Sequence, residues 1–323
     1  MLQNVLRMVR LADIKAAQSS IAGRVHRTPI FQSATLSARA GAEFLLKAEF
    51  LQKTGSFKVR GVLHKISRLT PEQKAAGLVS FSAGNHAAAL AFAASAQGVR
   101  STIVMPETAS PMKVQASKAY GAEIILHGKA ADAFAKMQEL QRTHGYTLVH
   151  PYDDDDIIAG HGTVGLEILE DVPDVDLVVV PVGGGGLIAG IATAVKAQSP
   201  NTRVYGVEPI GAPTLRAALD AGKVVRLESV QTIADGLAAP MTGEHVLEHV
   251  HAFVDDVVLV SDVEIKQALL LVLERCKFLL EPAGAAGIAA LLSGHIAVKP
   301  GSRVVAVASG GNLDLSRLQG LLA

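Results

Sequence analysis

The sequence contains no tryptophan and only one cysteine, and aromatic residues make up 4% of its 323 residues. A single cysteine excludes a disulfide framework and fits a reducing compartment. An excess of one charge is also missing, because 30 basic residues balance 30 acidic ones. Nothing in that balance would attract nucleic acid or an anionic membrane. The chain is 49% hydrophobic and 19% charged, a composition that excludes disorder.

A long unbroken hydrophobic run is absent as well. The uncharged stretch Leu177–Val195 is interrupted by Pro181 and by four glycines, Gly183–Gly186. These breakers favour a strand, a loop and a helix over a membrane span. Residues 1–17 scatter charges among apolar side chains, which is not the pattern of a signal peptide. We therefore expect a cytoplasmic protein without membrane contact.

Short runs rich in Val and Ile alternate with helical patterns along the chain. Most runs are apolar throughout, as strands buried on both faces of a parallel sheet are. Helix starts are marked at Thr70, Ser110 and Ser261 by a following proline or by a glutamate or glutamine three residues later. This alternation predicts an α/β fold with a largely parallel sheet. The predicted strands are Glu43–Phe50, Leu78–Phe81, Ser101–Met105, Glu123–Leu126, Thr147–His150, Leu177–Val182, Arg203–Val207, Asp256–Val260 and Arg303–Ala308.

At roughly 150 residues per domain, the length indicates two domains or one large α/β unit. No linker rich in Ser, Gly or Pro marks a boundary, so the boundary is inferred from topology. We predict a small inserted α/β domain at residues 68–147 and a large cofactor-binding domain formed by residues 1–67 and 148–323. Ligands tend to bind in the cleft that such an insertion leaves.

The four glycines Gly183–Gly186 follow the predicted strand Leu177–Val182 and precede a predicted helix. Backbone N–H groups of such a loop can bind a phosphate, and side chains would block that approach. The sequence therefore predicts an anion site. Gly184–Ala189 also fits a variant of the dinucleotide fingerprint, with Glu208 where a ribose-binding acid would lie. An NAD-dependent oxidoreductase is thus an alternative, whereas a second match, Gly160–Gly165, follows no strand and is discounted.

The segment Lys53–Gly61 holds three cations, two hydroxyls and two glycines around one aromatic residue. It is neither amphipathic nor a simple turn, and it weighs against the oxidoreductase. A lysine that is desolvated among neighbouring cations has a lowered pKa and becomes a nucleophile for carbonyl groups. Lys58 is the candidate for this role, although most lysines are simply solvated.

Four short motifs together resemble those of one enzyme family. Ser56–Gly61 is similar to the lysine motif of fold-type II pyridoxal phosphate enzymes, in particular the serine/threonine dehydratase group. Ser82–His86 resembles their asparagine loop, Gly183–Gly186 their phosphate cup, and Ser309–Asn312 the segment that faces the pyridine nitrogen. The motifs keep the family's order, and the resemblance covers residues 27–312. It implies an α/β fold of the tryptophan synthase β type, with two open, twisted, mostly parallel sheets and flanking helices.

The resemblance also implies roles for particular residues. Lys58 would hold pyridoxal 5'-phosphate as a Schiff base and, once free, would act as the catalytic base. Ser309 would face the ring nitrogen and, being neutral, would favour loss of a β-leaving group over transamination. The other implied cofactor ligands are Phe57, Asn85, Gly183, Gly184, Gly185, Gly186, Leu187, Gly236 and Glu281. The implied substrate-binding residues are Ser82, Ala83, Gly84, Asn85, His86 and Tyr152.

The implied activity is β-elimination, which converts L-threonine to 2-oxobutanoate, or L-serine to pyruvate, and releases ammonia. A dehydratase or racemase for another β-hydroxy amino acid, such as 3-hydroxyaspartate, is the alternative within the family. Ala83 stands where related serine racemases carry a serine base, so racemisation is expected to be weak or absent. Thr214 replaces the second acid of a divalent-ion site, which leaves Glu208 and Ala212 as weak metal candidates, and no metal is expected.

The chain ends shortly after Asn312, which leaves no room for the C-terminal regulatory domain of biosynthetic threonine dehydratases. The resemblance is therefore to a short form that isoleucine would not inhibit. The expected partner is a small amino-acid substrate rather than nucleic acid. The expected assembly is a homodimer or homotetramer, since closed symmetric oligomers are common among soluble proteins.

Overall fold

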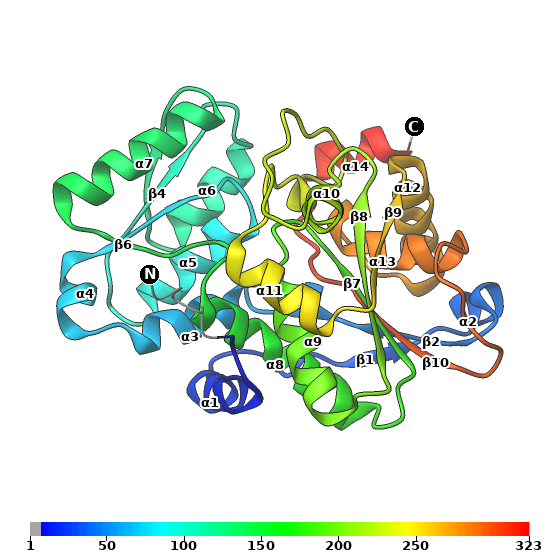
Figure 1. Cartoon of the computed structure of the whole chain (residues 1–323). Coiled ribbons are helices and arrows are strands. Elements are labelled where there is room, and N and C mark those ends of the chain that lie inside the picture. Colours follow the sequence, from blue (N-terminus) through cyan, green and yellow to red (C-terminus); the bar gives the residue numbers. More distant parts are fainter. Residues whose placement is uncertain (1–7, 323) are drawn as a thin grey trace.

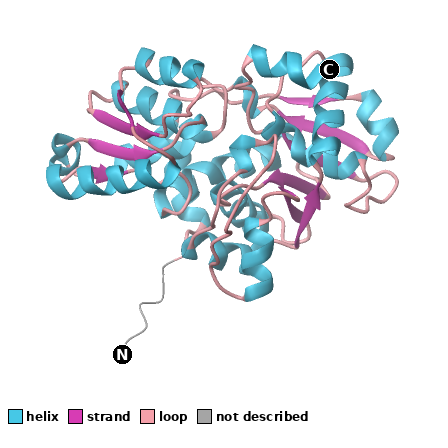
Figure 2. Cartoon of the chain, turned by 90° about the horizontal axis from the view of Figure 1, so that it is seen from above, coloured by secondary structure: helices cyan, strands magenta, loops and turns pink. Residues whose placement is uncertain are grey.

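The computed structural model describes residues 8–322. Residues 1–7, which belong to the N-terminal stretch that was compared with a signal peptide, lie outside this range. Within this range the strands form two sheets that lie side by side (Figures 1 and 2). The strands are β1 (Ile30–Gln32), β2 (Glu43–Lys47), β3 (Leu78–Phe81), β4 (Ser101–Met105), β5 (Glu123–Leu126), β6 (Thr147–Leu148), β7 (Leu177–Pro181), β8 (Arg203–Pro209), β9 (Asp256–Val260) and β10 (Arg303–Val307).

Helices separate most of the strands, as the alternating sequence pattern predicts. The α-helices are α1 (Leu11–Ile21), α2 (Ala34–Ala40), α3 (Lys58–Arg68), α4 (Pro71–Ala76), α5 (Asn85–Ser95), α6 (Pro111–Ala119), α7 (Ala130–His144), α8 (Asp155–Asp171), α9 (Gly186–Gln198), α10 (Thr214–Ala221), α11 (Glu244–Phe253), α12 (Asp262–Leu271), α13 (Pro282–Leu292) and α14 (Leu315–Leu322). Short 3-10 turns are η1 (Glu49–Leu51) and η2 (Asp235–Leu237), and η3 (Val272–Cys276) is a π-helical turn.

The larger sheet has the order β1-β2-β10-β7-β8-β9, and its neighbouring strands are parallel except β1 with β2. Its strands alternate between two hydrophobic cores. Val178 and Val180 of β7 share a core with α8, α9 and α11, whereas Leu177 and Val179 share one with α12 and α13. Burial on both faces explains why β7 is apolar throughout.

The smaller sheet has the order β5-β4-β3-β6, and all its pairs are parallel. Helices α3 and α5 share one core with its strands, and Ile157 of α8 belongs to the same core. Met137 of α7 packs on the other face, against Val79 and Val104. The helix that begins at Lys58 therefore lies between the two sheets, next to α8 (Figure 1).

These two sheets confirm the predicted fold class. The nine predicted strands are all present, and β1 is an additional edge strand that the sequence did not reveal. The prediction of a strand over Glu43–Phe50 is wrong at its end, because the strand stops at Lys47 and the chain enters η1. The strand predicted over Thr147–His150 stops at Leu148. The domain boundaries at residues 68 and 147 stay a prediction.

The three predicted helix starts are confirmed, and two of them have a capping hydrogen bond. Thr70 and Ser261 each accept a hydrogen bond from the third residue of the helix that follows, as a capping box requires. Ser110 is the N-cap residue of the helix that begins at Pro111, so the predicted helix start is confirmed. Its hydroxyl, however, donates to Asp314 at 3.3 Å and makes no capping hydrogen bond.

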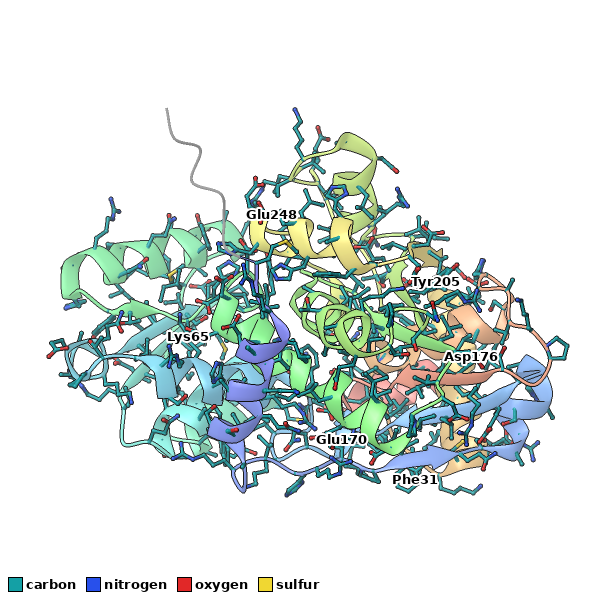
Figure 3. All side chains as sticks on the ribbon, turned by 60° about the horizontal axis from the view of Figure 1, so that its bottom comes forward. Phe31, Lys65, Glu170, Asp176, Tyr205 and Glu248 are labelled. Atoms are coloured by element: carbon teal, nitrogen blue, oxygen red, sulfur yellow. The ribbon has the colours of Figure 1, made fainter. Side chains whose placement is uncertain are left out.

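Helix α8 contacts α3 and α9 through glycines. A methyl group on Gly160 would lie 2.5 Å from the Cα of Gly61 in α3, and one on Gly190 in α9 would lie 2.5 Å from the Gly162 nitrogen. Only glycine lets two helix backbones approach this closely. The discounted match Gly160–Gly165 is therefore a helix-packing segment. In Figure 3, labelled side chains identify these helices: Lys65 belongs to α3 and Glu170 lies near the end of α8.

The uncharged stretch from Leu177 to Val195 forms β7, the glycine loop and most of α9, as predicted. Among the helices of residues 8–322, none is long and apolar enough to cross a membrane.

Candidate active site

Lys58 is the first residue of α3, and its amine meets neutral groups. Nζ donates to the Pro151 carbonyl at 2.6 Å and lies 5.0 Å from the centre of the Phe57 ring. Within residues 8–322 no carboxylate pairs with this amine. The residue as a whole is only partly buried, but its amine is desolvated, which lowers its pKa to about 8. A lysine with this pKa is neutral often enough near pH 7 to react with a carbonyl group.

Burial alone lowers this pKa, and the predicted contribution of neighbouring cations is wrong. Arg60 is neutralised by two carboxylates, Glu49 at 2.8 Å and Glu167 at 2.7 Å. Lys47 also pairs with Glu167, at 2.7 Å. All four side chains are buried, and we call them the ion quartet. Because two cations balance two carboxylates, the quartet leaves no net charge to act on Lys58.

The glycine loop between β7 and α9 lies against Tyr152 and η2. A methyl group on Gly184 would lie 2.2 Å from the Tyr152 ring, and one on Gly183 would lie 3.1 Å from the Gly236 carbonyl oxygen. Gly185 has a φ of +92°, which residues other than glycine rarely adopt. The loop therefore presents backbone N–H groups at the start of a helix, where an anion binds well. Leu187, the second residue of α9, is buried in the core.

Asn85 begins α5 and meets two side chains from the C-terminal part of the chain. Its Nδ2 donates to Glu281 at 2.6 Å, and its Oδ1 accepts a hydrogen bond from Asn312 at 2.9 Å. Burial raises the pKa of Glu281 to about 7. The buried residue Ser309 accepts a hydrogen bond at its carbonyl from the Phe57 N–H at 3.2 Å. The segments predicted to face the cofactor ring are thus tied to each other and to the lysine motif.

The loop Ser82–Gly84 connects β3 to α5, and the N–H of Gly84 donates to the Ser82 hydroxyl at 3.3 Å. Ala83 is partly buried against the core of α3 and α5. His86 donates from Nε2 to the Val149 carbonyl at 3.0 Å, because a carbonyl can only accept. Burial, followed by the charge of Lys58, lowers the pKa of His86 to about 3. The imidazole is therefore neutral at physiological pH.

The contacts join most of the predicted cofactor ligands, together with Pro151, Tyr152 and Gly310, into a closed circuit. Each member touches or closely approaches the next, although the members come from distant parts of the sequence. In order around the circuit they are Lys58, Pro151, Tyr152, Gly184, Gly183, Gly236, Glu281, Asn85, Gly310, Ser309 and Phe57.

The circuit fits pyridoxal phosphate. It combines a buried amine that pairs with no carboxylate of the described residues, a glycine loop at a helix N-terminus and an asparagine held by other side chains. Within residues 8–322, the Thr54 and Ser56 hydroxyls and Nδ1 of His86 are buried without hydrogen-bond partners. Buried polar atoms are normally hydrogen-bonded, so unpaired ones are expected where a bound group completes the bonding.

Glu208 is not part of the circuit. Its two carboxylate oxygens accept the N–H groups of Leu215 at 2.7 Å and Arg216 at 2.8 Å, in the first turn of α10. The Thr214 hydroxyl donates to the Ala239 carbonyl. Glu208 therefore stabilises a helix start, and its oxygens do not face a ribose. Ala212 is buried nearby, and the described residues contain no cluster of His, Cys, Asp or Glu that could hold a metal ion.

Several site features were not predicted. No sequence pattern indicated that the Pro151 carbonyl would accept from Lys58. The same is true of the buried ring of His161, which packs edge-on against Phe57 with centroids 4.7 Å apart. Both depend on how α8 crosses α3. Asn312 did have a signal, since it ends the predicted Ser309 motif, but its partner could not be inferred.

The chain matches the family of pyridoxal-phosphate dependent enzymes over residues 21–310, and it belongs to that family. This result confirms the predicted cofactor and decides against the NAD-dependent alternative.

Individual relatives make the similarity more specific. An L-threonine ammonia-lyase of Thermotoga maritima is 44% identical, over 98% of this chain and 78% of the relative. The catabolic L-threonine dehydratase TdcB of Staphylococcus aureus is 45% identical, over 98% of this chain and 92% of the relative. The solved structure of maize serine racemase is similar with a TM-score of 0.93 at 39% identity, and the match covers 98% of this chain and 97% of that one.

Proposed function

We propose that this chain is a pyridoxal-phosphate-dependent ammonia-lyase that converts L-threonine, L-serine or both into a 2-oxo acid and ammonia. The observation that carries the proposal is the amine of Lys58, which is buried without a carboxylate partner in a circuit that also contains the glycine loop. Similarity to two L-threonine ammonia-lyases over 98% of the chain supports the substrate class.

Lys58 has two roles in this reaction. It holds the cofactor covalently between turnovers, and when its amine is free it removes the α-proton of the substrate and keeps it at Nζ. The Pro151 carbonyl, 2.6 Å away, orients that amine, and a pKa of about 8 lets it accept the proton. Bound pyridoxal phosphate supplies an electron sink for the bond that breaks at the α-carbon.

The other residues of the circuit bind and orient. The loop Ser82–Gly84 and the start of α5, with Asn85 and the neutral His86, receive the substrate carboxylate, because N–H groups at a helix N-terminus favour an anion. The N–H groups of the glycine loop receive the phosphate in the same way, with Gly236 and Tyr152 packed against that loop. Ser309 offers the ring nitrogen a neutral partner, which favours loss of the β-hydroxyl over transamination.

Racemisation is expected to be weak, although maize serine racemase is a close structural relative. The methyl group of Ala83 cannot exchange a proton on the second face of the substrate. Assembly as a homodimer or homotetramer and a cytoplasmic location stay predictions.

The direct experiment is an assay of purified protein with pyridoxal phosphate, measuring 2-oxo acid and ammonia from threonine and serine. Lys58→Ala is expected to lower activity at least ~10³-fold, because it removes the general base, and to abolish the absorption band that borohydride bleaches. Lys53→Ala, an exposed lysine of the same segment, is the matched control and should keep both. Chiral chromatography of the remaining serine measures racemisation. A wild-type protein that takes up no pyridoxal phosphate, or a fully active Lys58→Ala, contradicts the proposal.

A further inference from the structure

Three side chains, those of Asn312, Asn85 and Glu281, form a row of hydrogen bonds that begins at a backbone carbonyl. Nδ2 of Asn312 donates to the Thr54 carbonyl at 2.8 Å and to Oδ1 of Asn85 at 2.9 Å. Nδ2 of Asn85 then donates to Oε1 of Glu281 at 2.6 Å. The row connects the segment Lys53–Gly61 with the asparagine loop, the N-terminus of α13 and the segment after β10.

The direction of every bond in the row follows from the Thr54 carbonyl. A carbonyl oxygen only accepts, so the atom of Asn312 that faces it must be the amide nitrogen. The same nitrogen faces Asn85, which must therefore present its oxygen. The nitrogen of Asn85 is left facing Glu281, whose carboxylate accepts. The orientation of the Asn85 amide, which electron density seldom reveals directly, is thus determined by its neighbours.

Close backbone packing keeps the row in place. A methyl group on Gly55 would lie 2.2 Å from Oδ1 of Asn312, and one on Gly310 would lie 2.2 Å from Oε1 of Glu281 and 3.2 Å from Nδ2 of Asn85. Gly310 belongs to the predicted motif Ser309–Asn312 and Gly55 to the segment Lys53–Gly61, and here they make room for the two ends of the row. Neither asparagine can turn its amide over without leaving a buried group unpaired, which costs more than a hydrogen bond gains.

An amide nitrogen has two hydrogens and Glu281 takes one of them, so Asn85 keeps one N–H for another partner. We propose that Asn312 and Glu281 are positioning residues that restrict Asn85 to donating this N–H, so that it favours the deprotonated oxygen on the ring of the bound cofactor. This inference rests on the proposed function and on the family resemblance, which implies that Asn85 is a cofactor ligand at the ring oxygen. It adds a reason why the asparagine donates rather than accepts.

The charge of Glu281 makes the restriction depend on pH. Burial raises the pKa of Glu281 to about 7, and the bond from Asn85 opposes that rise. Asp235 of η2 also raises it, whereas Lys113 of α6 and Arg317 of α14 lower it. Above this pKa the carboxylate can only accept from Asn85. Below it the protonated carboxyl is a neutral and weaker acceptor. Asn312 still faces Oδ1 of Asn85, so the amide keeps its direction but is held less tightly from the Glu281 end.

Absorption spectra of the holoenzyme between pH 6 and 9 test this inference, because a deprotonated ring oxygen gives the visible-edge band and a protonated one gives a near-ultraviolet band. Glu281→Gln and Asn312→Ala should each lower the ratio of the two bands about fivefold, the effect of one hydrogen bond. In the wild type the ratio should fall as the pH drops through about 7, and in Glu281→Gln this step should be absent. Cofactor affinity, measured by fluorescence, should weaken in both variants.

Glu208→Gln is the matched control, because Glu208 is also buried, also has its pKa raised to about 7, and binds only backbone N–H groups of α10. It should keep the wild-type ratio and its pH dependence. If Glu281→Gln does not fold, Asn312→Ala tests the other end of the row alone. Normal cofactor binding and lyase activity with unchanged band ratios in Asn312→Ala would overturn this inference and leave the proposed function intact. Absence of cofactor from the wild type would overturn both.

Discussion

Lys58 and Arg60 are two buried cations in the first turn of the same helix, and their surroundings differ in one respect. The amine of Lys58 has a carbonyl as its polar partner, and burial lowers its pKa to about 8. Arg60 has two carboxylates, and its bonds to Glu49 and Glu167 hold its charge permanently. Burial beside a neutral acceptor yields a group that can give and take a proton, whereas burial beside carboxylates yields a fixed ion.

Breaking the ion quartet should have the largest effect on stability. Glu167→Gln removes one carboxylate from Arg60 and Lys47, both of which are buried. An uncompensated buried charge costs about 3–5 kcal/mol, so the free energy of unfolding should fall by that amount in urea titrations. Glu170→Gln, which breaks the exposed pair with Arg27, is the control and should change it by less than ~1 kcal/mol. Equal effects of the two substitutions would show that the quartet is not stabilising.

Replacing Lys58 by methionine should raise the free energy of unfolding of the apoprotein, whereas Glu167→Gln should lower it. The folded-state pKa of Lys58 is about 8 against 10.5 for the free side chain, which corresponds to at most ~3 kcal/mol. Between those values the unfolded state binds more protons, so wild-type stability rises with pH. The advantage of Lys58→Met should therefore be full below pH 8 and should disappear as the pH approaches 10.5.

Lys53→Met is the control, since Lys53 is exposed on the same segment. It should not reproduce the gain in stability that Lys58→Met shows below pH 8. Urea unfolding of the three apoproteins at several pH values measures both curves. A constant difference between wild type and Lys58→Met would contradict the assigned pKa.

A smaller effect is expected from moving the turn that carries both cations. A methyl group at position 160 would lie 2.8 Å from the Arg60 carbonyl and 2.5 Å from the Cα of Gly61. Gly160→Ala should therefore displace the first turn of α3 and destabilise the protein by about 1–3 kcal/mol, with a matching loss of lyase activity. Gly320→Ala, in α14 with nothing within 4 Å of the added methyl, should be neutral or gain up to ~1 kcal/mol. Thermal unfolding of the two variants compares them, and a stable, fully active Gly160→Ala would contradict the close contact.

The sequence predicted the features that depend on a local pattern of residues and missed the contacts between residues that are far apart in the chain. Runs such as Leu177–Val182 reveal buried strands because every residue in them is apolar, and no partner elsewhere in the chain is needed to recognise the pattern. The glycine loop was found from its position after such a strand, whereas the Ser309 segment was found through its resemblance to a family motif. Arg60 and Glu167 are 107 residues apart, and Asn85 and Glu281 are 196 apart. No local signal tells which carboxylate will reach which cation, so Arg60 was taken for a neighbour that perturbs Lys58.

The strand that ended early shows the same limit. Glu49 was included in the strand predicted over Glu43–Phe50, yet it leaves the sheet in η1 and binds Arg60 in the core. Its charge gave no hint that the strand had ended, because Glu43 and Lys47 are also charged and belong to β2. A partner was needed to explain why a glutamate should be buried there.

The glycine contacts of α8 set a dimension of the whole molecule. On one side α8 touches the helix that begins at Lys58, and on the other it touches the helix that begins at the glycine loop. Both contacts are made by backbone atoms, so the spacing of the three helices does not depend on side-chain packing. The distance between the Lys58 amine and the glycine loop is therefore fixed, and substitutions in the surrounding cores would leave unchanged the length of molecule that fits between them.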